Sequence, residues 1–120
     1  MIVEDEEDIL NLYRDYLSNR GHDVVSCSED TNNIITNFEK CKPDICLMDH
    51  MVGGRGVGID AAAQILEKSP STPILFITAY ESMKSELPRH HEFDDRNVQV
   101  LMKPARLSEL EEYMLNMVNN

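Results

Sequence analysis

The 120-residue chain is short of cysteine and of long apolar runs. Its three cysteines, Cys27, Cys41 and Cys46, are an odd number without a CxxC pair, which argues against a disulfide framework and a zinc site. The longest strictly aliphatic and aromatic run, Ile74–Ile77, is far too short to cross a bilayer, and no charged-then-apolar signal segment opens the chain. We therefore expect a reduced, cytoplasmic setting.

Positive charge is also scarce. Eleven Lys and Arg residues face 22 Asp and Glu residues, which gives a formal net charge of -11. That excess repels phosphate backbones and anionic lipids, so we expect no direct binding to nucleic acid or to a membrane. The hydrophobic fraction of 42% and the charged fraction of 28% are those of an ordinary globular protein. The length fits one domain, and we expect residues 1–120 to form it.

Short apolar runs alternate with helical patterns along the chain. The expected strands are residues 2–3, 24–25, 45–48, 74–78 and 98–102. Between them, apolar residues recur at helical spacing. A weak helix is broken at Pro88 in the polar segment 80–97, for which we expect either an irregular helix or a mobile loop. The last helix begins near Ser108, and Glu111 three residues on fits a capping box. Five strands alternating with five helices predict an α/β fold with a parallel sheet covered on both faces.

Polar side chains stand at the ends of four of the five expected strands. They are Glu4 and Asp5 after the first strand, Asp49 after the third, Thr78 as the last residue of the fourth and Lys103 after the fifth. Because open parallel sheets bind ligands at the carboxyl ends of their strands, we expect these side chains to share one pocket. Two carboxylates about 4 Å apart repel by about 4 kcal/mol at an effective dielectric near 20, so the crowded carboxylates favour either a proton or a divalent cation, for which Mg²⁺ is suited. A carboxylate can also accept a phosphoryl group, with a cation, a lysine and a hydroxyl to stabilise the charge.

The segments that carry these residues resemble the receiver domain of two-component response regulators. They are IVEDEEDI at the start, LMD ending at Asp49, FITA around Thr78 and MKP at Met102–Pro104, and the resemblance covers essentially the whole chain. It implies the flavodoxin-like strand order 2-1-3-4-5 and a cis peptide bond between Lys103 and Pro104. It also implies one receiver domain over residues 1–120, with no output domain in this chain.

By position, the resemblance implies that Asp49 is the phosphoacceptor and that Thr78 and Lys103 contact the phosphoryl group. It also implies that Asp5, Asp49 and the backbone carbonyl of Met51 bind Mg²⁺ directly and that Glu4 assists through a water. The donor would be a sensor histidine kinase or a phosphotransfer protein, and the recipient a downstream protein target or a detached output domain. A homodimer through helix 4, strand 5 and helix 5 is a further possibility. Such a domain is not an enzyme, since it catalyses only its own phosphorylation and dephosphorylation.

The chain departs from the receiver pattern in three places. The glycine-rich segment Met51–Gly58 replaces the usual Met-Pro pair after the acceptor, and Val100 stands where many receivers have a switching aromatic residue. Because Val100 has no ring to move, signalling would run through a rearrangement of segment 80–97 instead. The usual Gly-Ala-Asp-Asp stretch before the fifth strand is also missing, although Asp94 and Asp95 resemble part of it. These departures leave open a receiver-fold interaction module that signals without phosphorylation. A phosphatase with an aspartate nucleophile fits less well, because Met51 stands where its second acid is expected.

Three further side chains carry expectations. His22, in the turn after Gly21, is expected to be solvated, and Cys46 to be inert core packing. Tyr80 and Met51 resemble the variable positions that flank the phosphoryl group in receivers. Both are bulky enough to obstruct an attacking water, so we expect slow autodephosphorylation.

Overall fold

The computed structural model describes residues 1–25, 27–28, 31–49 and 57–119. The strands are β1 (Ile2–Val3), β2 (Cys27–Ser28), β3 (Cys46–Asp49), β4 (Ile74–Thr78) and β5 (Val98–Met102). The α-helices are α1 (Glu7–Asn19), α2 (Thr31–Cys41), α3 (Val57–Lys68), α4 (Ser82–Glu86) and α5 (Leu107–Val118), and the 3₁₀ turns are η2 (Leu87–Arg89) and η3 (His91–Phe93). None of the helices in these ranges is long and apolar enough to cross a membrane.

The strands of the described residues form one five-stranded sheet in the order β2-β1-β3-β4-β5. Every neighbouring pair is parallel. The predicted α/β class with a parallel sheet and helices on both sides is confirmed, and the strands lie in the order that the resemblance implies. The order reverses between β1 and β3, where the carboxyl ends of adjacent strands leave room for a ligand.

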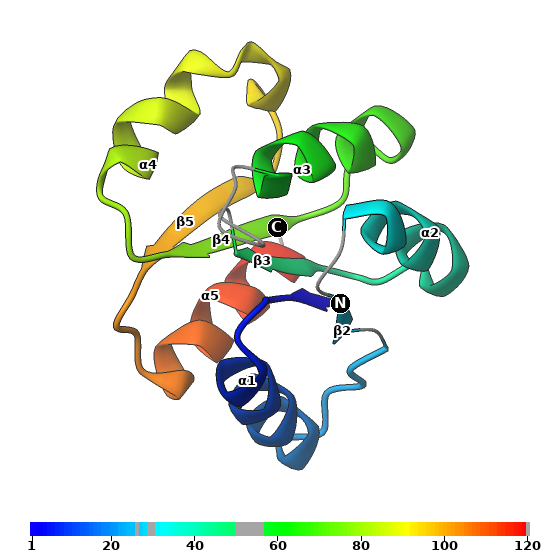
Figure 1. The fold of residues 1–120 in the computed structure, drawn as a ribbon, viewed down its shortest axis with the longest axis vertical. Helices are drawn as coiled ribbons and strands as arrows, with labels where there is room; N and C mark the ends of the chain where they lie inside the picture. The colour runs from blue at the N-terminus through cyan, green and yellow to red at the C-terminus, as the bar shows by residue number, and fades with distance from the viewer. Residues whose placement is uncertain (26, 29–30, 50–56, 120) are drawn as a thin grey trace.

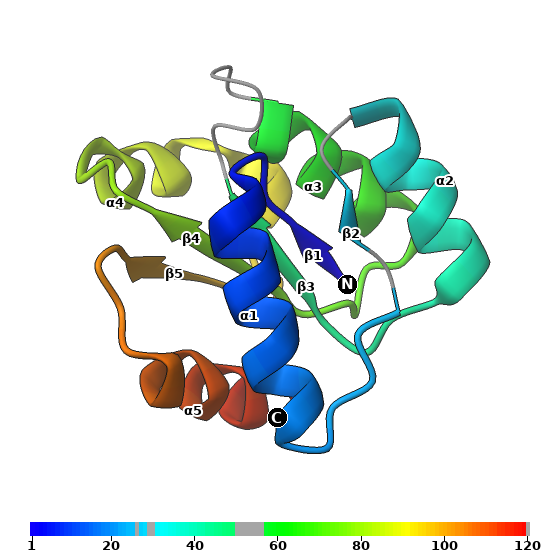
Figure 2. The same ribbon diagram turned by 60° about the horizontal axis from the view of Figure 1, so that its bottom comes forward.

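Helices cover both faces of the sheet, with α1 and α5 on one side and α2, α3 and α4 on the other (Figures 1 and 2). Alternate strand residues divide between the two layers. Ile2, Leu47 and Leu75 pack with α1 and α5, whereas Met48 and Phe76 pack with the other three helices. Strands buried on both faces must be apolar throughout, which is why the sequence reveals β3 and β4 so clearly.

The second strand was predicted at residues 24–25, and that position is wrong. The backbone pairs with β1 three residues later, where Cys27 lies opposite Ile2 and Ser28 opposite Val3. Val24 packs against the α1–α5 layer from the connection before the strand, and Val25 is 39% exposed. The apolar pair therefore contributes to the surface of the core without joining the sheet.

The predicted capping box at Ser108 is also wrong. Helix α5 begins one residue earlier, at Leu107, with Arg106 as the N-cap residue and no side-chain capping hydrogen bond. The Glu111 carboxylate accepts hydrogen bonds from Arg20 and His22 instead. His22 was expected to be solvated, and this contact with a buried carboxylate overturns that expectation.

The segment between β4 and β5 contains an irregular helix, which is one of the two alternatives expected for it. Helix α4 has five residues, and Pro88 lies in the 3₁₀ turn that follows it. Two buried side chains attach the segment to the sheet: Met83 from α4 and Phe93 from η3. The Phe93 ring meets Phe76 of β4 edge-on, with 6.0 Å between the ring centroids.

Candidate functional site

The candidate site lies at the carboxyl edge of the sheet. Asp49 is the last residue of β3, and Thr78 is the last residue of β4. The register places Asp49 beside Ile77 and Thr78 beside Met102, so neighbouring strands end at the same level. Lys103 directly follows β5, and its peptide bond to Pro104 is cis. The fold thus brings residues distant in sequence to one edge.

Three carboxylates converge at this edge. Glu4, Asp5 and Asp49 each offer one oxygen, and these oxygens all lie within 4.8 Å of one another. Glu4 is buried, while Asp5 and Asp49 are half-buried. At such separations the repulsion between ionised carboxylates is large, so the cluster needs a compensating positive charge.

Lys103 supplies part of that charge. Its Nζ donates a hydrogen bond to Glu4 Oε2 at 3.4 Å, and the side chains are 19% and 2% exposed. Burial alone would lower the pKa of Lys103, but the carboxylates of Glu4 and Asp49 raise it above its ordinary value. The lysine therefore stays positively charged beside the carboxylates.

Glu4 remains incompletely paired despite this contact. Its Oε1 atom is buried and has no hydrogen-bond partner among the described residues. Burial and, next, the charge of Asp49 raise the pKa of Glu4 to about 7, against the opposing effect of Lys103. A buried acceptor without a partner is costly. Hard oxygen ligands at this spacing suit Mg²⁺, which binds a few carboxylates and keeps several waters, so the residues present fit that cation.

Thr78 accepts hydrogen bonds from two neighbouring segments, one that leads into α4 and one that follows β5. The side chain is fully buried, and its Oγ1 accepts a hydrogen bond from the Tyr80 backbone N–H at 3.0 Å. The Thr78 carbonyl accepts one from the Lys103 N–H at 2.7 Å. Tyr80 itself is 53% exposed. The hydroxyl is thereby oriented by the segment that leads into α4.

Tyr13 of α1 is a neighbour of the site that the sequence does not single out. Burial raises the pKa of its phenol, while Lys103 lowers it and Glu4 and Asp49 raise it. The aromatic residue on an apolar helix face gave no signal of this proximity. The predicted fourth cation ligand, Met51, lies outside the described residues. The other predicted site residues all lie at the carboxyl edge of the sheet. They are Glu4, Asp5, Asp49, Thr78 and Lys103.

The structure thus combines a parallel α/β sheet with an acidic cluster and a lysine at its switch point. The profile of the response regulator receiver domain matches residues 1–115, and the chain belongs to this family. It is therefore a receiver domain of the two-component response regulator type.

Individual relatives agree with this assignment. The chain is 32% identical over 113 residues to the regulatory protein LuxO of Vibrio cholerae. The matched region covers 91% of this chain and 23% of LuxO. It resembles the response regulator PhyR from Brucella abortus at 26% identity and a TM-score of 0.79, over 99% of this chain and 46% of that one. The receiver domain of NtrX from the same organism shares the fold, at 18% identity and a TM-score of 0.84 over 99% and 97% of the two chains. The chain thus spans under a quarter of the curated relative.

Proposed function

We propose that Asp49 is the phosphoacceptor, and that it takes a phosphoryl group from the phosphohistidine of a sensor histidine kinase or a phosphotransfer protein. The observation that carries the proposal is the convergence of three carboxylates within 4.8 Å with Lys103 bound to one of them. Asp49 is the half-buried member at the end of β3. It is therefore reachable by a donor, whereas Glu4 is buried.

In the proposed transfer, an Asp49 carboxylate oxygen forms a bond to phosphorus. The phosphorus–nitrogen bond to the donor histidine breaks, and its electron pair leaves with the imidazole. The Lys103 ammonium offsets charge on the phosphoryl oxygens, and the Thr78 hydroxyl donates a hydrogen bond to one of them. Mg²⁺ held by Glu4, Asp5 and Asp49 would neutralise further charge on the transferred group.

The contact between Lys103 and Glu4 supports this role for the lysine. At 3.4 Å the hydrogen bond from Lys103 to Glu4 is long, and we expect Lys103 to exchange it for a contact with the phosphoryl group. When a phosphoryl group on Asp49 adds negative charge nearby, Lys103 has a second acceptor within the same pocket. The lysine can thus leave Glu4 without becoming an unpaired buried cation.

We propose that the domain acts as a cytoplasmic signalling module that catalyses only its own phosphorylation and dephosphorylation. Residues 1–120 would be one receiver domain, whose face of α4, β5 and α5 binds a protein target, a detached output domain or a second copy. Val100 is half-buried against the layer of α2, α3 and α4 and has no ring to swing. The hydrogen bond between Thr78 and Tyr80 favours a signal that travels through the α4 segment instead.

Intact-mass spectrometry tests the phosphoacceptor role. Incubation with acetyl phosphate and Mg²⁺ should add the mass of one phosphoryl group to the wild type and nothing to Asp49→Asn. Asp44→Asn is the matched control, since Asp44 is an exposed carboxylate outside the cluster and its loss should leave the mass gain unchanged. No mass gain in the wild type, together with no Mg²⁺-dependent rise in melting temperature, would favour the interaction module that signals without phosphorylation.

A further inference from the structure

Helix α1 ends in a backbone turn that requires glycine. Gly21 has a φ of +93°, a left-handed conformation that other residues adopt at a cost. The Gly21 N–H donates to the Ser18 carbonyl at 3.1 Å, and the His22 N–H donates to the Leu17 carbonyl at 3.0 Å. This is the Schellman motif. It fixes the positions of the two residues beside the glycine, Arg20 and His22.

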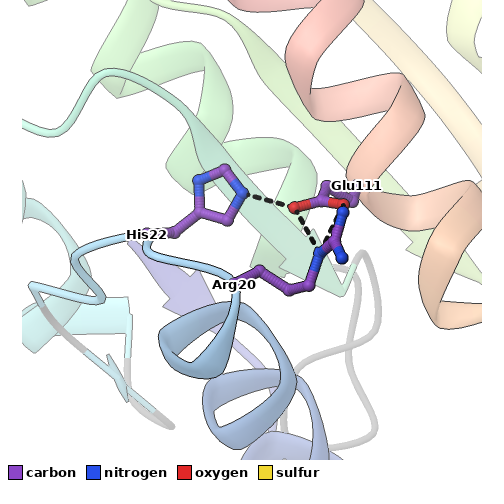
Figure 3. Close-up of polar contacts among 3 residues, drawn as sticks. All are labelled: Arg20, His22 and Glu111. Carbon is purple, nitrogen blue, oxygen red and sulfur yellow. Dashed lines mark hydrogen bonds and ion pairs between the residues drawn. The ribbon is translucent and has the colours of Figure 1, made fainter.

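Both of these residues reach one carboxylate on α5. Arg20 Nε lies 3.0 Å and Nη2 2.9 Å from Glu111 Oε1, and His22 Nε2 lies 2.7 Å from Glu111 Oε2 (Figure 3). Glu111 is buried, with a side chain only 10% exposed. Hydrogen bonding from Arg20 and then from His22 lowers the pKa of Glu111. These three residues form what we call the α1–α5 ion-pair cluster.

The same two chain segments also meet at the candidate site. Glu4 precedes α1 and Lys103 precedes α5, and their side chains are in contact. The α1–α5 ion-pair cluster joins Arg20 and His22, on either side of the glycine that ends α1, to Glu111 in the second turn of α5. Between the two polar contacts, apolar side chains of α1 and α5 share one core layer that includes Leu17 and Leu110. The helices are therefore held together at two separate polar points.

The two points differ in what phosphorylation would do to them. Under the proposed function, Lys103 turns from Glu4 to the phosphoryl group, so the contact at the site is exchanged. The Glu111 carboxylate has two donors of its own and takes no part in the transfer. The contact between His22 and Glu111 is charge-assisted and mostly shielded from solvent, with side chains 28% and 10% exposed, whereas the Arg20 side chain is 58% exposed and its contact is more screened.

We propose that the α1–α5 ion-pair cluster holds α5 against α1 while Lys103 is released from Glu4. The cluster is a conformational device that confines the response of α5 to its site-facing end. The trigger rests on the proposed function, whereas the holding role can be measured without phosphorylation.

A double-variant cycle measures the holding role. Lys103→Met removes the contact at the site, and Glu111→Gln weakens the cluster. Hydrogen exchange of the α5 backbone amides is measured in the wild type, both single variants and the double variant. We expect exchange in the double variant to be about tenfold faster than the product of the two single effects, because either contact alone keeps α5 docked. Rates equal to that product would overturn the proposal.

Two sets of variants control for a general loss of structure. Glu112→Gln changes an exposed carboxylate next to Glu111, and with Lys103→Met it should give the simple product. Arg20→Gln and His22→Gln each leave one donor to Glu111, so each should couple to Lys103→Met more weakly than Glu111→Gln does. Equal coupling from Glu112→Gln would contradict the assignment, and the donor variants supply the same test if Glu111→Gln does not fold.

The trigger is tested separately with acetyl phosphate and Mg²⁺. Phosphorylated Glu111→Gln should show faster α5 exchange than its unphosphorylated form, while the wild type stays protected in both. If the wild type gains no phosphoryl mass, the proposed function fails and the double-variant cycle still decides the holding role. If both proteins are phosphorylated and α5 stays equally protected in each, the proposed device is wrong.

Discussion

Glu4 is the residue at which burial and charge oppose each other most directly. It keeps one buried oxygen without a hydrogen-bond partner in the described part of the chain and shares its surroundings with two other carboxylates. Its pKa, raised to about 7 by burial and then by Asp49, records that conflict. A group whose pKa is raised on folding favours the folded state most at low pH. This contribution is lost as the pH rises from 4.5 to about 7.

The same residue makes cation binding depend on pH. Below a pH of about 7, Mg²⁺ must displace a proton from Glu4, so we expect its affinity to fall by about tenfold per pH unit and to level off above. Calorimetric titration of Mg²⁺ at several pH values measures this. Glu4→Gln should bind more weakly at high pH and lose the slope near 7. A wild-type Mg²⁺ affinity that stays constant from about pH 5 to about pH 7, the range below the raised pKa of Glu4, would contradict this account.

Tyr80 is expected to shield the phosphoryl group from water. Its backbone N–H donates to the Thr78 hydroxyl at 3.0 Å, so its side chain, 53% exposed, starts next to the site. Tyr80→Ala should speed the loss of the phosphoryl group about three- to tenfold, because it opens a path for the attacking water. Tyr80→Phe keeps the bulk and should leave the rate unchanged. A decay that is equal or slower in the alanine variant, followed by intact mass over time, would refute the shielding role.

At the scale of elements, the stability of the α4 segment depends on how its side chains pack against the sheet. Its helix has five residues, too short to be stable without tertiary packing. Met83 and Phe93 are buried, and Leu87 packs against the same core layer. Because the short helix depends on such contacts, we expect the segment to change its position when the Thr78 hydroxyl finds a new partner.

Removing one attachment should cost stability. Phe93→Ala deletes a buried ring that packs edge-on against Phe76, and we expect the free energy of unfolding to fall by about 3 kcal/mol. Glu92→Ala, at the exposed neighbouring position, should stay within about 0.5 kcal/mol of the wild type. Urea denaturation measures both. A Phe93→Ala variant as stable as Glu92→Ala would show that the segment does not depend on this contact.

The helix pair α1 and α5 should show its own pH dependence. Because the pKa of Glu111 is lowered in the folded protein, its contribution to stability is present above the ordinary carboxyl value of 4.5 and is lost as the pH falls through the lower folded value. Glu111→Gln should therefore be less stable than the wild type at neutral pH, with a gap that closes in acid. Urea denaturation of both proteins at neutral pH and in acid measures the difference in their free energies of unfolding. A gap that does not change with pH would contradict the ionic nature of the contact.

At the scale of the whole molecule, sequence reasoning succeeded where one local property decides the structure. Strand β4 is apolar at each of its first four positions because both of its faces are buried, and the residues that end the strands follow directly from that. Strand β2 was misplaced, because its position depends on register with β1 and not on the apolar pair Val24 and Val25. The α1–α5 ion-pair cluster joins residues 91 and 89 positions apart. Such a contact depends on how two helices cross, which no local pattern encodes.

The central claim is that a parallel sheet gathers Glu4, Asp5, Asp49, Thr78 and Lys103 into one phosphoryl-accepting pocket with Asp49 as the acceptor. Borohydride reduction of the protein after treatment with acetyl phosphate and Mg²⁺ tests it most directly, because it converts an aspartyl phosphate to homoserine. Peptide mass mapping should then find homoserine at position 49, and only in the sample that received both reagents. Homoserine at another position, or a phosphoryl mass gain with an unreduced Asp49, would contradict the claim.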